Sequence, residues 1–342
     1  MGHLWVNLWV HMSVCLSFTR MRQMAPVLLV GLALSAAGYG YAADMFPTRP
    51  LRMLVGYPAG GPNDITARIT AEYLSGVLGQ QVIVDNRAGA GGTISATILS
   101  QAAPDGYTLG LCANGEMAIA PNLRLKMPYD PLRDFAPVSR VGAGQLALVV
   151  PVAFTAKSAG DFVALAKTKP GALNFASAGT GSTAHLAGEL FKAMAKIDIV
   201  HVPYKGAAPA LADVIGGQVQ MLITGYSGVV PHARAGRLRV LAVTGAQRLK
   251  AAPELPTIGE TLPGYEVNSW YGVFAPAATP RALLDRFQRD IMTMTRTPSV
   301  ITRMVALGIE PEGNTRQEFA ALMKQEITKW RKVVEAAGLA KE

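Results

Sequence analysis

The chain has 342 residues, of which 50% are hydrophobic and 16% are charged. This composition excludes a disordered chain, and the length suits two domains of about 150 residues each. There are two cysteines, Cys15 and Cys112, which excludes a scaffold built on several disulfides. The formal net charge of +9 mildly favours anionic small molecules or anionic surfaces as partners.

The N-terminal region has the pattern of a secretory signal peptide. Arg22 supplies a positive charge, and residues 25–37 form an uncharged, mostly apolar run. The small residues around Ala42 suit a cleavage site. We therefore predict that residues 1–43 are the signal peptide and that the mature chain starts near Asp44.

Residues 1–20 do not fit a signal peptide, and we interpret them as an extension from a start codon assigned too early. On that interpretation Met21 or Met24 is the true start. The alternative is a signal anchor, but the apolar run is shorter than the roughly 20 residues that a membrane helix needs. We expect a soluble protein outside the cytoplasm, in the periplasm.

Beyond residue 50 the pattern alternates between short apolar strands and amphipathic helices. This alternation predicts an α/β fold with mainly parallel sheets, and a break near residue 143 favours two sheets over one. The predicted strands are Leu51–Gly56, Val82–Asp85, Tyr107–Cys112, Val138–Val141, Leu146–Pro151, Asn174–Ser177, Ile199–Pro203, Met221–Thr224, Leu238–Thr244 and Val267–Ala275. The predicted helices are 93–102, Pro62–Leu78, Ser158–Lys169, Ser182–Ala195, Ala207–Ile215, Val229–Ala235, Arg281–Thr295, Ser299–Ala306 and Arg316–Ala337.

Three glycine-containing turns connect a strand to the helix that follows it: Tyr57–Asp64, Ser177–His185 and Tyr204–Ala207. Turns of this kind lie at the carboxyl ends of strands, where open α/β sheets bind ligands. Each opens a helix whose free N–H groups favour an anion. Several such helix starts, if they converged, would hold a carboxylate without an arginine. Each turn alone is better explained as an ordinary tight connection.

Motifs for catalysis, metals or nucleotides are absent from the sequence. It contains no phosphate-binding loop, dinucleotide fingerprint, zinc-protease helix or hydrolase elbow. The spacing of His185, His201 and His232 suggests no metal site, so we expect no cofactor. Ser182 and His185 lie three residues apart, which allows a Ser–His pair on one helix face. The simpler interpretation is a capping serine beside a packed histidine. Basic residues are not interleaved with aromatic ones, so we expect no nucleic-acid partner.

A series of short motifs runs in order along nearly the whole mature chain. The segments are 47–52 (PTRPLR), 57–64 (YPAGGPND), 86–92 (NRAGAGG), 103–109 (APDGYTL), 128–131 (PYDP), 134–137 (DFAP), 185–191 (HLAGELF), 201–206 (HVPYKG), 216–219 (GGQV) and 241–244 (LAVT). Together they resemble the substrate-binding receptors of tripartite tricarboxylate transporters, the Bug receptor family.

The resemblance implies a type II periplasmic binding protein. Such a protein has two doubly wound α/β domains joined by two hinge strands, with the ligand cleft between the domains. Residues 44–142 with 268–342 would then be domain 1, and residues 143–267 domain 2. Residues 141–146 and 267–273 would be the hinges.

The resemblance also implies a set of ligand-binding residues. In the family, backbone amides of two facing loops hold one carboxylate. Carried over to this chain, these loops supply Pro58, Ala59, Gly60, Gly61 and Asp64 from domain 1, and Gly179, Thr180, Gly181, Ser182 and His185 from domain 2. Tyr57, Asn114, Tyr204 and Tyr226 would be walls of the cleft.

This chain departs from the family pattern after the strand that ends at Thr224. Many members have an aspartate or asparagine there, whereas this chain continues Gly225-Tyr226-Ser227. The departure argues against a ligand with an ammonium group. A neutral Tyr226 would suit an aromatic or simple organic acid.

The function implied is a monomeric receptor that closes on a small organic carboxylate and delivers it to integral membrane transporter subunits. One alternative is a ligand-sensing adaptor for a membrane signalling protein, with the same fold and cleft. Another is an enzyme that uses Ser182 and His185, although the leading interpretation is not an enzyme. The sequence does not name the carboxylate.

Overall fold

The computed structural model describes residues 46–123, 126–336 and 339. From Arg49 onward the described residues form one compact unit. The predicted signal peptide and the extension before it lie outside the described residues. Within the described ranges, no helix has the length and apolar character needed to cross a bilayer.

The first group of elements is built around three parallel strands. β1 lies between β2 and β3 and pairs in parallel with both. Helix α2 has the predicted bounds, since Pro62 suits the first helical position and Gly79 ends the helix in the left-handed conformation. The elements are β1 (Leu51–Val55), α2 (Pro62–Leu78), β2 (Val82–Asn86), η1 (Ala90–Gly92), α3 (Thr93–Ser100), β3 (Thr108–Ala113), η2 (Gly115–Ile119) and α4 (Ala120–Leu123).

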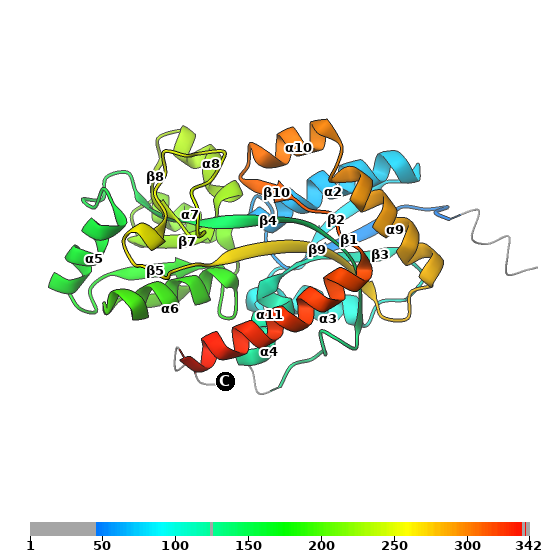
Figure 1. Ribbon diagram of the computed structural model, residues 1–342, viewed down its shortest axis with the longest axis horizontal. Coiled ribbons are helices and arrows are strands. Elements are labelled where there is room, and N and C mark those ends of the chain that lie inside the picture. The colour runs from blue at the N-terminus through cyan, green and yellow to red at the C-terminus, as the bar shows by residue number, and fades with distance from the viewer. Residues whose placement is uncertain (1–45, 124–125, 337–338, 340–342) are drawn as a thin grey trace, which may run out of the picture. The chain divides into compact units, whose positions relative to one another are not determined.

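The second group repeats the alternation of strand and helix. β5 pairs in parallel with β6 and β7, and helices α5 to α8 gather around these strands (Figure 1). The elements are α5 (Ala159–Thr168), β5 (Asn174–Ser177), α6 (Thr183–Ala195), β6 (Val200–Pro203), α7 (Ala207–Ile215), β7 (Met221–Gly225), α8 (Tyr226–Arg234), β8 (Leu238–Val243) and η3 (Ile258–Glu260). Helix α8 begins at Tyr226, three residues before the predicted start.

One long strand, β4 (Phe135–Pro151), belongs to both groups. Up to Gln145 it pairs with β9 and β10, and from Leu146 it pairs with β7 and β8. The two strands predicted in this region are therefore one continuous strand, although its pairings fall into two sets that change at Leu146. The break predicted near residue 143 lies inside the strand, where a Cβ atom on Gly142 would lie 2.7 Å from the Glu310 carbonyl oxygen.

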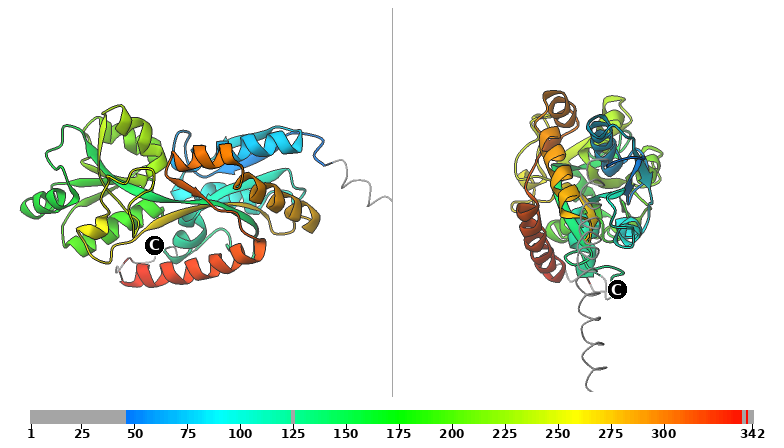
Figure 2. Two further views of the ribbon diagram at one scale, coloured as in Figure 1. Left: turned by 45° about the horizontal axis from the view of Figure 1, so that its top comes forward. Right: turned by 90° about the vertical axis from the view of Figure 1, so that its right-hand side faces the viewer.

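The sheet is mixed rather than mainly parallel, which corrects a second prediction. The strand order is β2-β1-β3-β9-β4-β7-β5-β6, with β8 and β10 also paired to β4. β9 (Asn268–Pro276) returns from late in the chain and inserts antiparallel between β3 and β4. In Figures 1 and 2, β4 and β9 run side by side from one group of elements toward the other. An alternation of strands and helices does not reveal strand direction, so the sequence could not show this.

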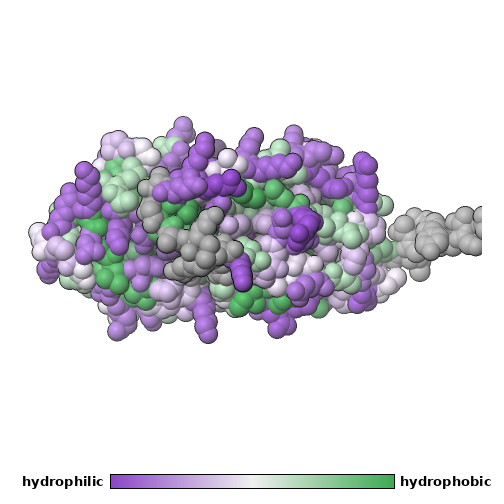
Figure 3. Space-filling view, turned by 90° about the horizontal axis from the view of Figure 1, so that it is seen from below, coloured by the Kyte–Doolittle hydropathy of each residue, from purple (hydrophilic) through white to green (hydrophobic). Residues whose placement is uncertain are grey.

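The C-terminal elements join the first group, which makes that group discontinuous in the sequence. β10 pairs with β4, and the Asn122 amide on α4 donates to the Ile327 carbonyl oxygen at 3.0 Å. Trp270 packs with Phe274 and Phe319 in a buried cluster. The hydropathy view of one face shows hydrophilic side chains separated by smaller apolar areas (Figure 3). The elements are α9 (Arg281–Met294), α10 (Pro298–Val305), β10 (Ile309–Pro311) and α11 (Arg316–Ala336).

Candidate functional site

Both groups of elements line one cavity of about 40 Å³. It lies where the glycine-containing turns meet, so the three predicted helix starts do converge. None of the lining side chains carries a charge at neutral pH. The lining residues are Tyr57, Gly61, Pro62, Asn63, Ala113, Leu146, Ala178, Ser182, Thr183, Ala184, Ala207, Thr224, Gly225, Ser269 and Tyr271.

Four helices, α2, α6, α7 and α8, begin at this cavity. Three of them are preceded by a glycine that offers no side-chain cap: Gly61, Gly206 and Gly225. In the described part of the chain no N-cap side chain accepts their first-turn N–H groups, and the positive ends of the helix dipoles lie at a common space. The sequence predicted three of these starts and missed the fourth, at Gly225.

Hydrogen bonds to Asp64, which lies outside the cavity wall, stabilise the first turn, residues 57–64. This buried carboxylate accepts hydrogen bonds from the Gly60 N–H at 2.9 Å, Arg68 Nε at 2.8 Å and Asn86 Nδ2 at 3.0 Å. Asn86 Nδ2 also donates to the Tyr57 carbonyl oxygen at 2.8 Å. Burial alone would raise the pKa of Asp64, but the hydrogen bonds, led by that of Arg68, lower it overall. Asp64 thus shapes the turn without lining the cavity.

Asn63, next to Asp64, lines the cavity and is 9% exposed. Its Nδ2 group is buried and finds no acceptor within the described part of the chain. A buried amide without a partner is costly and is normally paired. Asn63 therefore brings an amide donor without a partner to the wall of the cavity. Its place in the first turn of α2 was noticeable in the sequence, but it was not predicted as a site residue.

The second turn, residues 177–185, is held by uncharged groups. Ser182 lines the cavity and caps α6, because its Oγ accepts the His185 backbone N–H at 3.2 Å. The Gly181 N–H donates to His185 Nδ1 at 3.4 Å. The contact between Ser182 and His185 is thus a helix cap, as the simpler interpretation expected. Gly179 and Gly181 both have positive φ, which the turn requires.

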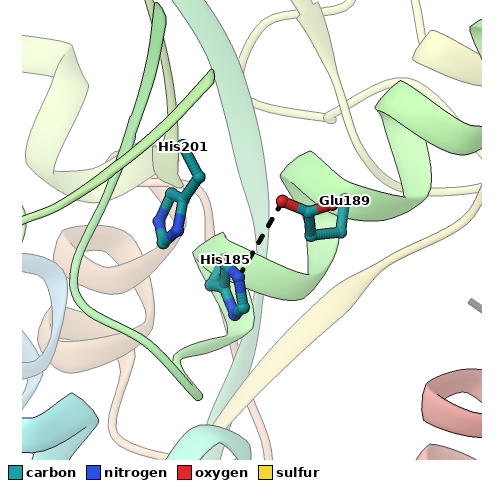
Figure 4. A group of neighbouring side chains, drawn as sticks. All are labelled: His185, Glu189 and His201. Atoms are coloured by element: carbon teal, nitrogen blue, oxygen red, sulfur yellow. Dashed lines mark ion pairs between the residues drawn. The ribbon is translucent and has the colours of Figure 1, made fainter. Parts of the chain in front are cut away.

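His185 is part of a packed group that also includes Glu189 and His201 (Figure 4). The two imidazole rings stack with centroids 4.3 Å apart, and Phe175 stacks on the far side of His201 at 4.8 Å. Burial lowers the pKa of His185 to about 4 and that of His201 to about 3. Glu189 Oε1 lies 3.9 Å from His185 Nε2.

These three residues are of types that bind metals, and their spacing in the sequence did not reveal that they meet. Their ligand atoms lie within 4.8 Å of one another. However, the rings lie face to face, so their in-plane lone pairs do not converge on one point. His201 Nε2 is also 2.7 Å from Ser177 Oγ, which holds the ring in place. The geometry is that of a neutral stack that supports the second turn.

Asn114 ties the two groups together beside the cavity. Its Oδ1 accepts hydrogen bonds from Thr183 Oγ1 at 2.7 Å and Ser269 Oγ at 3.1 Å. Its Nδ2 donates to the Asn268 carbonyl oxygen at 3.1 Å. Asn114 is fully buried, while its neighbour Ala113 lines the cavity.

Glycines allow the two groups to approach closely. A Cβ atom at Gly91 would lie 2.6 Å from the Thr180 carbonyl oxygen, and one at Gly225 would lie 2.6 Å from Pro62 Cγ. One at Gly206 would lie 2.1 Å from Pro58 Cδ. These contacts leave no room for side chains at the three glycines.

The remaining predicted residues lie around the cavity rather than on its wall. Tyr204 donates its hydroxyl to Asp213 Oδ2 at 2.6 Å, and Tyr226 packs against Gly308. Ala59, Gly60 and Thr180 are exposed. Three of the fourteen predicted residues, Tyr57, Gly61 and Ser182, line the cavity directly. The sequence did not single out Thr183, Ala184 and Ala207, although they lie in the predicted turns, nor Gly225. It could not reveal Ser269 and Tyr271, because they reach the cavity on β9, far along the chain.

Comparison with known proteins identifies the class and the family. Structures that superpose closely are periplasmic binding proteins. One is the periplasmic binding protein BugD, with a TM-score of 0.84, 32% identity, and coverage of 87% of this chain and 100% of that one. The fold is therefore the type II-like α/β fold of periplasmic solute-binding proteins.

The chain belongs to the tripartite tricarboxylate transporter receptor family. Residues 66–339 match the family described as "Tripartite tricarboxylate transporter family receptor". A UPF0065 protein of Bordetella bronchiseptica is 39% identical over 316 residues, which are 92% of each chain. The family resemblance predicted from the motifs is thereby confirmed.

Two similar structures are described with small carboxylates. R. palustris Rpa4515 with adipate has a TM-score of 0.85 and 35% identity, and the match covers 87% of this chain and 100% of that one. MatC (Rpa3494) from Rhodopseudomonas palustris with bound malate has a TM-score of 0.80 and 32% identity, covering 84% and 100%.

Proposed function

We propose that this protein is an extracytoplasmic receptor that binds one carboxylate of a small organic acid in the cavity and delivers the acid to membrane transporter subunits. The observation that carries the proposal is the meeting of four helix N-termini at a cavity with no charged wall. Family membership supports the delivery step, and the adipate and malate of the similar structures support the ligand class.

The electrostatics of the cavity suit an anion that is held without a cationic side chain. One helix N-terminus contributes about 0.3–1 kcal/mol toward an exposed charge and up to about 2 kcal/mol toward a partly buried one. Four starts facing one space act in the same direction. Asn63 Nδ2 adds a directed donor, and the ligand in turn relieves the cost of burying that group.

The exchange of partners along β4 supports a division into two domains. The change falls between Gln145 and Leu146, within residues 141–146, the predicted hinge. β9 begins at Asn268, next to the predicted second hinge. On this proposal the domains are 44–142 with 268–342, and 143–267, and they close on the ligand by bending at β4 and β9.

Substitution of Asn63 tests the proposed site. Asn63→Asp keeps the side-chain volume but places a carboxylate against the bound anion. At 4 Å and a dielectric of about 20 the repulsion is about 4 kcal/mol, so we expect affinity to fall more than about a hundredfold. The fold should persist, because an acidic residue suits the first turn of a helix. Asn174→Asp, at the start of β5, is the matched control.

The measurement is a thermal-shift panel of organic acids on the mature protein, followed by isothermal titration calorimetry. A ligand at 100 times its Kd adds about 2.7 kcal/mol, or about 5–10 °C. Binding that is lost in Asn63→Asp and kept in Asn174→Asp supports the proposal. Equal binding in both variants would mean that the acid does not bind beside Asn63.

The same samples test the enzyme alternative. Ser182 Oγ is occupied as the cap of α6, so we infer that the protein binds its ligand without chemical turnover. Incubation of each binding acid with the wild type, followed by mass spectrometry, should return the acid unchanged. A product that forms with the wild type and not with Ser182→Ala would contradict this inference.

A further inference from the structure

A fully buried carboxyl group, that of Glu116, lies behind the cavity wall. It is 1% exposed and belongs to η2, the π-helical turn that follows β3. Its Oε1 accepts the Ala113 backbone N–H at 2.8 Å. Its Oε2 lies 3.2 Å from the hydroxyl of Tyr57, which lines the cavity.

The hydrogen bonds around Tyr57 do not balance if Glu116 is ionised. The Tyr57 hydroxyl lies 2.9 Å from the Gly91 carbonyl oxygen and 3.2 Å from Glu116 Oε2. Both are acceptors when Glu116 is a carboxylate, yet a tyrosine has one hydrogen to donate. A proton on Oε2 resolves the conflict, because Glu116 then donates to Tyr57 and Tyr57 donates to Gly91.

The surroundings of Glu116 also favour its neutral form. Among the described residues no lysine or arginine pairs with it. The titratable groups near its carboxyl are the phenols of Tyr57 and Tyr271 and the thiol of Cys112, while Tyr129 donates its hydroxyl to the Glu116 backbone carbonyl oxygen at 2.6 Å. On α11, which packs against η2, Glu326 is occupied by two indole N–H groups. Burial raises the pKa of Glu116 to about 7 and outweighs the opposing effect of hydrogen bonds from the Ala113 and Glu116 backbone N–H groups and from Tyr57.

Tyr57 connects Glu116 to the two turns that form the cavity. The Gly91 carbonyl that accepts its hydrogen belongs to the segment that contacts the Thr180 carbonyl oxygen. A Cβ atom at Gly115 would lie 3.1 Å from the Tyr57 hydroxyl and 3.4 Å from Ser182 Cα. The Tyr57 hydroxyl therefore lies between Glu116 and the segments of the wall that contact the second turn.

We propose that Glu116 is a positioning residue that acts as a neutral carboxylic acid in the ligand-bound protein, so that binding of a carboxylate takes up a proton above neutral pH. The inference rests on the proposed function. The physical reason is that an ionised Glu116 behind Tyr57 would repel the ligand's carboxylate and leave one acceptor at Tyr57 without a hydrogen. The bound anion therefore favours the protonated form of Glu116.

The first test needs no ligand. The mature protein is labelled with carbon-13 at the glutamate carboxyl groups, and each carboxyl resonance is followed by NMR from about pH 4 to about pH 9. We expect one resonance to titrate near neutral pH and to be absent in Glu116→Gln. Titration of every glutamate at ordinary acidic pH would overturn the proposal, whether or not any acid binds.

The second test uses adipate as the probe in isothermal titration calorimetry above neutral pH, in two buffers of different protonation enthalpy. The wild type should take up a fraction of a proton on binding, and its affinity should fall by up to tenfold per pH unit. Glu116→Gln should show neither effect, because the side-chain amide of that variant donates to Tyr57 at every pH. Glu116→Leu, which cannot donate, should bind more weakly throughout.

Asp290→Asn is the matched control, since Asp290 is another carboxyl whose pKa is raised by burial but lies on α9, outside the cavity wall. It should behave as the wild type. Proton uptake that persists in Glu116→Gln would contradict the proposal. Failure of adipate to bind would count against the proposed function for this acid, while the NMR titration would still decide the protonation of Glu116.

Discussion

The two turns that meet at the cavity are both fixed in place by buried side chains, but the anchor of the first is ionised and the anchors of the second are neutral. Residues 57–64 are held by an ionised group, because Asp64 accepts hydrogen bonds from Arg68, Asn86 and the turn itself. Residues 177–185 are held by neutral groups, the Ser182 cap and the stack of His185 on His201. Both arrangements leave helix N–H groups facing the ligand space. The residues that fix the turns of an anion site can thus be charged or neutral, provided that no negatively charged side chain lines the cavity itself.

The difference predicts that acid affects the two turns over different pH ranges. The pKa values of His185 and His201 are lowered to about 4 and about 3, below the usual 6.5 of an unfolded chain. The unfolded chain therefore gains protons first, and stability is lost as pH falls below about 6.5. The pKa of Asp64 is also lowered, so its contribution is lost only as pH falls below about 4.

The largest effect is expected from removing the anchor of the first turn. Asp64→Ala leaves one amide hydrogen of Asn86 and the Gly60 N–H without an acceptor, which should cost about 3 kcal/mol of unfolding free energy. Urea denaturation measures this cost. Glu72→Ala, on the same helix, removes an exposed ion pair with Arg303 and should cost less than about 1 kcal/mol. Equal costs for the two variants would mean that Asp64 does not anchor the turn.

A smaller effect is expected from the pH dependence of the second turn. Between about pH 6.5 and about pH 5 the wild type should lose about 1.6 kcal/mol per imidazole relative to a His185→Gln/His201→Gln variant. Glu116 contributes in the opposite direction over this range, because its folded pKa is raised to about 7. The comparison at each pH removes that contribution, which both proteins share. Parallel curves for the two proteins would show that the imidazoles are not buried in their neutral form.

The smallest effect concerns the contact between the turns rather than either turn. Gly225→Ala introduces no backbone strain, but its Cβ atom would lie 2.6 Å from Pro62 Cγ. We expect the two groups to be held apart and the affinity for a binding acid to fall about tenfold, or about 1.4 kcal/mol. Gly76→Ala, within α2 and with nothing in range of its Cβ atom, should leave affinity unchanged. Isothermal titration calorimetry measures the affinity of both variants. An equal loss in both would mean that the contact of residue 225 with Pro62 is not the cause.

Local patterns predicted local structure well. The bounds of Pro62–Leu78, Asn174–Ser177 and Ala207–Ile215 agree with the structure, because each has a proline, glycine or strand pattern that marks its ends. The turns at Tyr57 and Ser182 were recognised from glycines and capping residues for the same reason. These features depend on a few neighbouring residues.

Features that depend on residues far apart in the chain could not be predicted from the sequence. The continuity of β4 depends on β9, β7 and β10, which are separated from it by many residues. Ser269 and Tyr271 reach the cavity because β9 inserts beside β3 and β4. The role of Glu116 depends on Tyr57 and Gly91, which no motif connects to it. The predicted part of the cavity wall is therefore limited to residues of the first two turns, Tyr57, Gly61 and Ser182.

The central claim is that a carboxylate is held by helix N-termini and Asn63 rather than by a cation. A crystal structure of the mature protein grown with the tightest-binding acid tests it most directly. We expect one carboxylate within hydrogen-bond distance of Asn63 Nδ2 and of first-turn amides of α2 and α6. A carboxylate paired with an arginine or lysine side chain, with Asn63 Nδ2 still without an acceptor, would contradict the account.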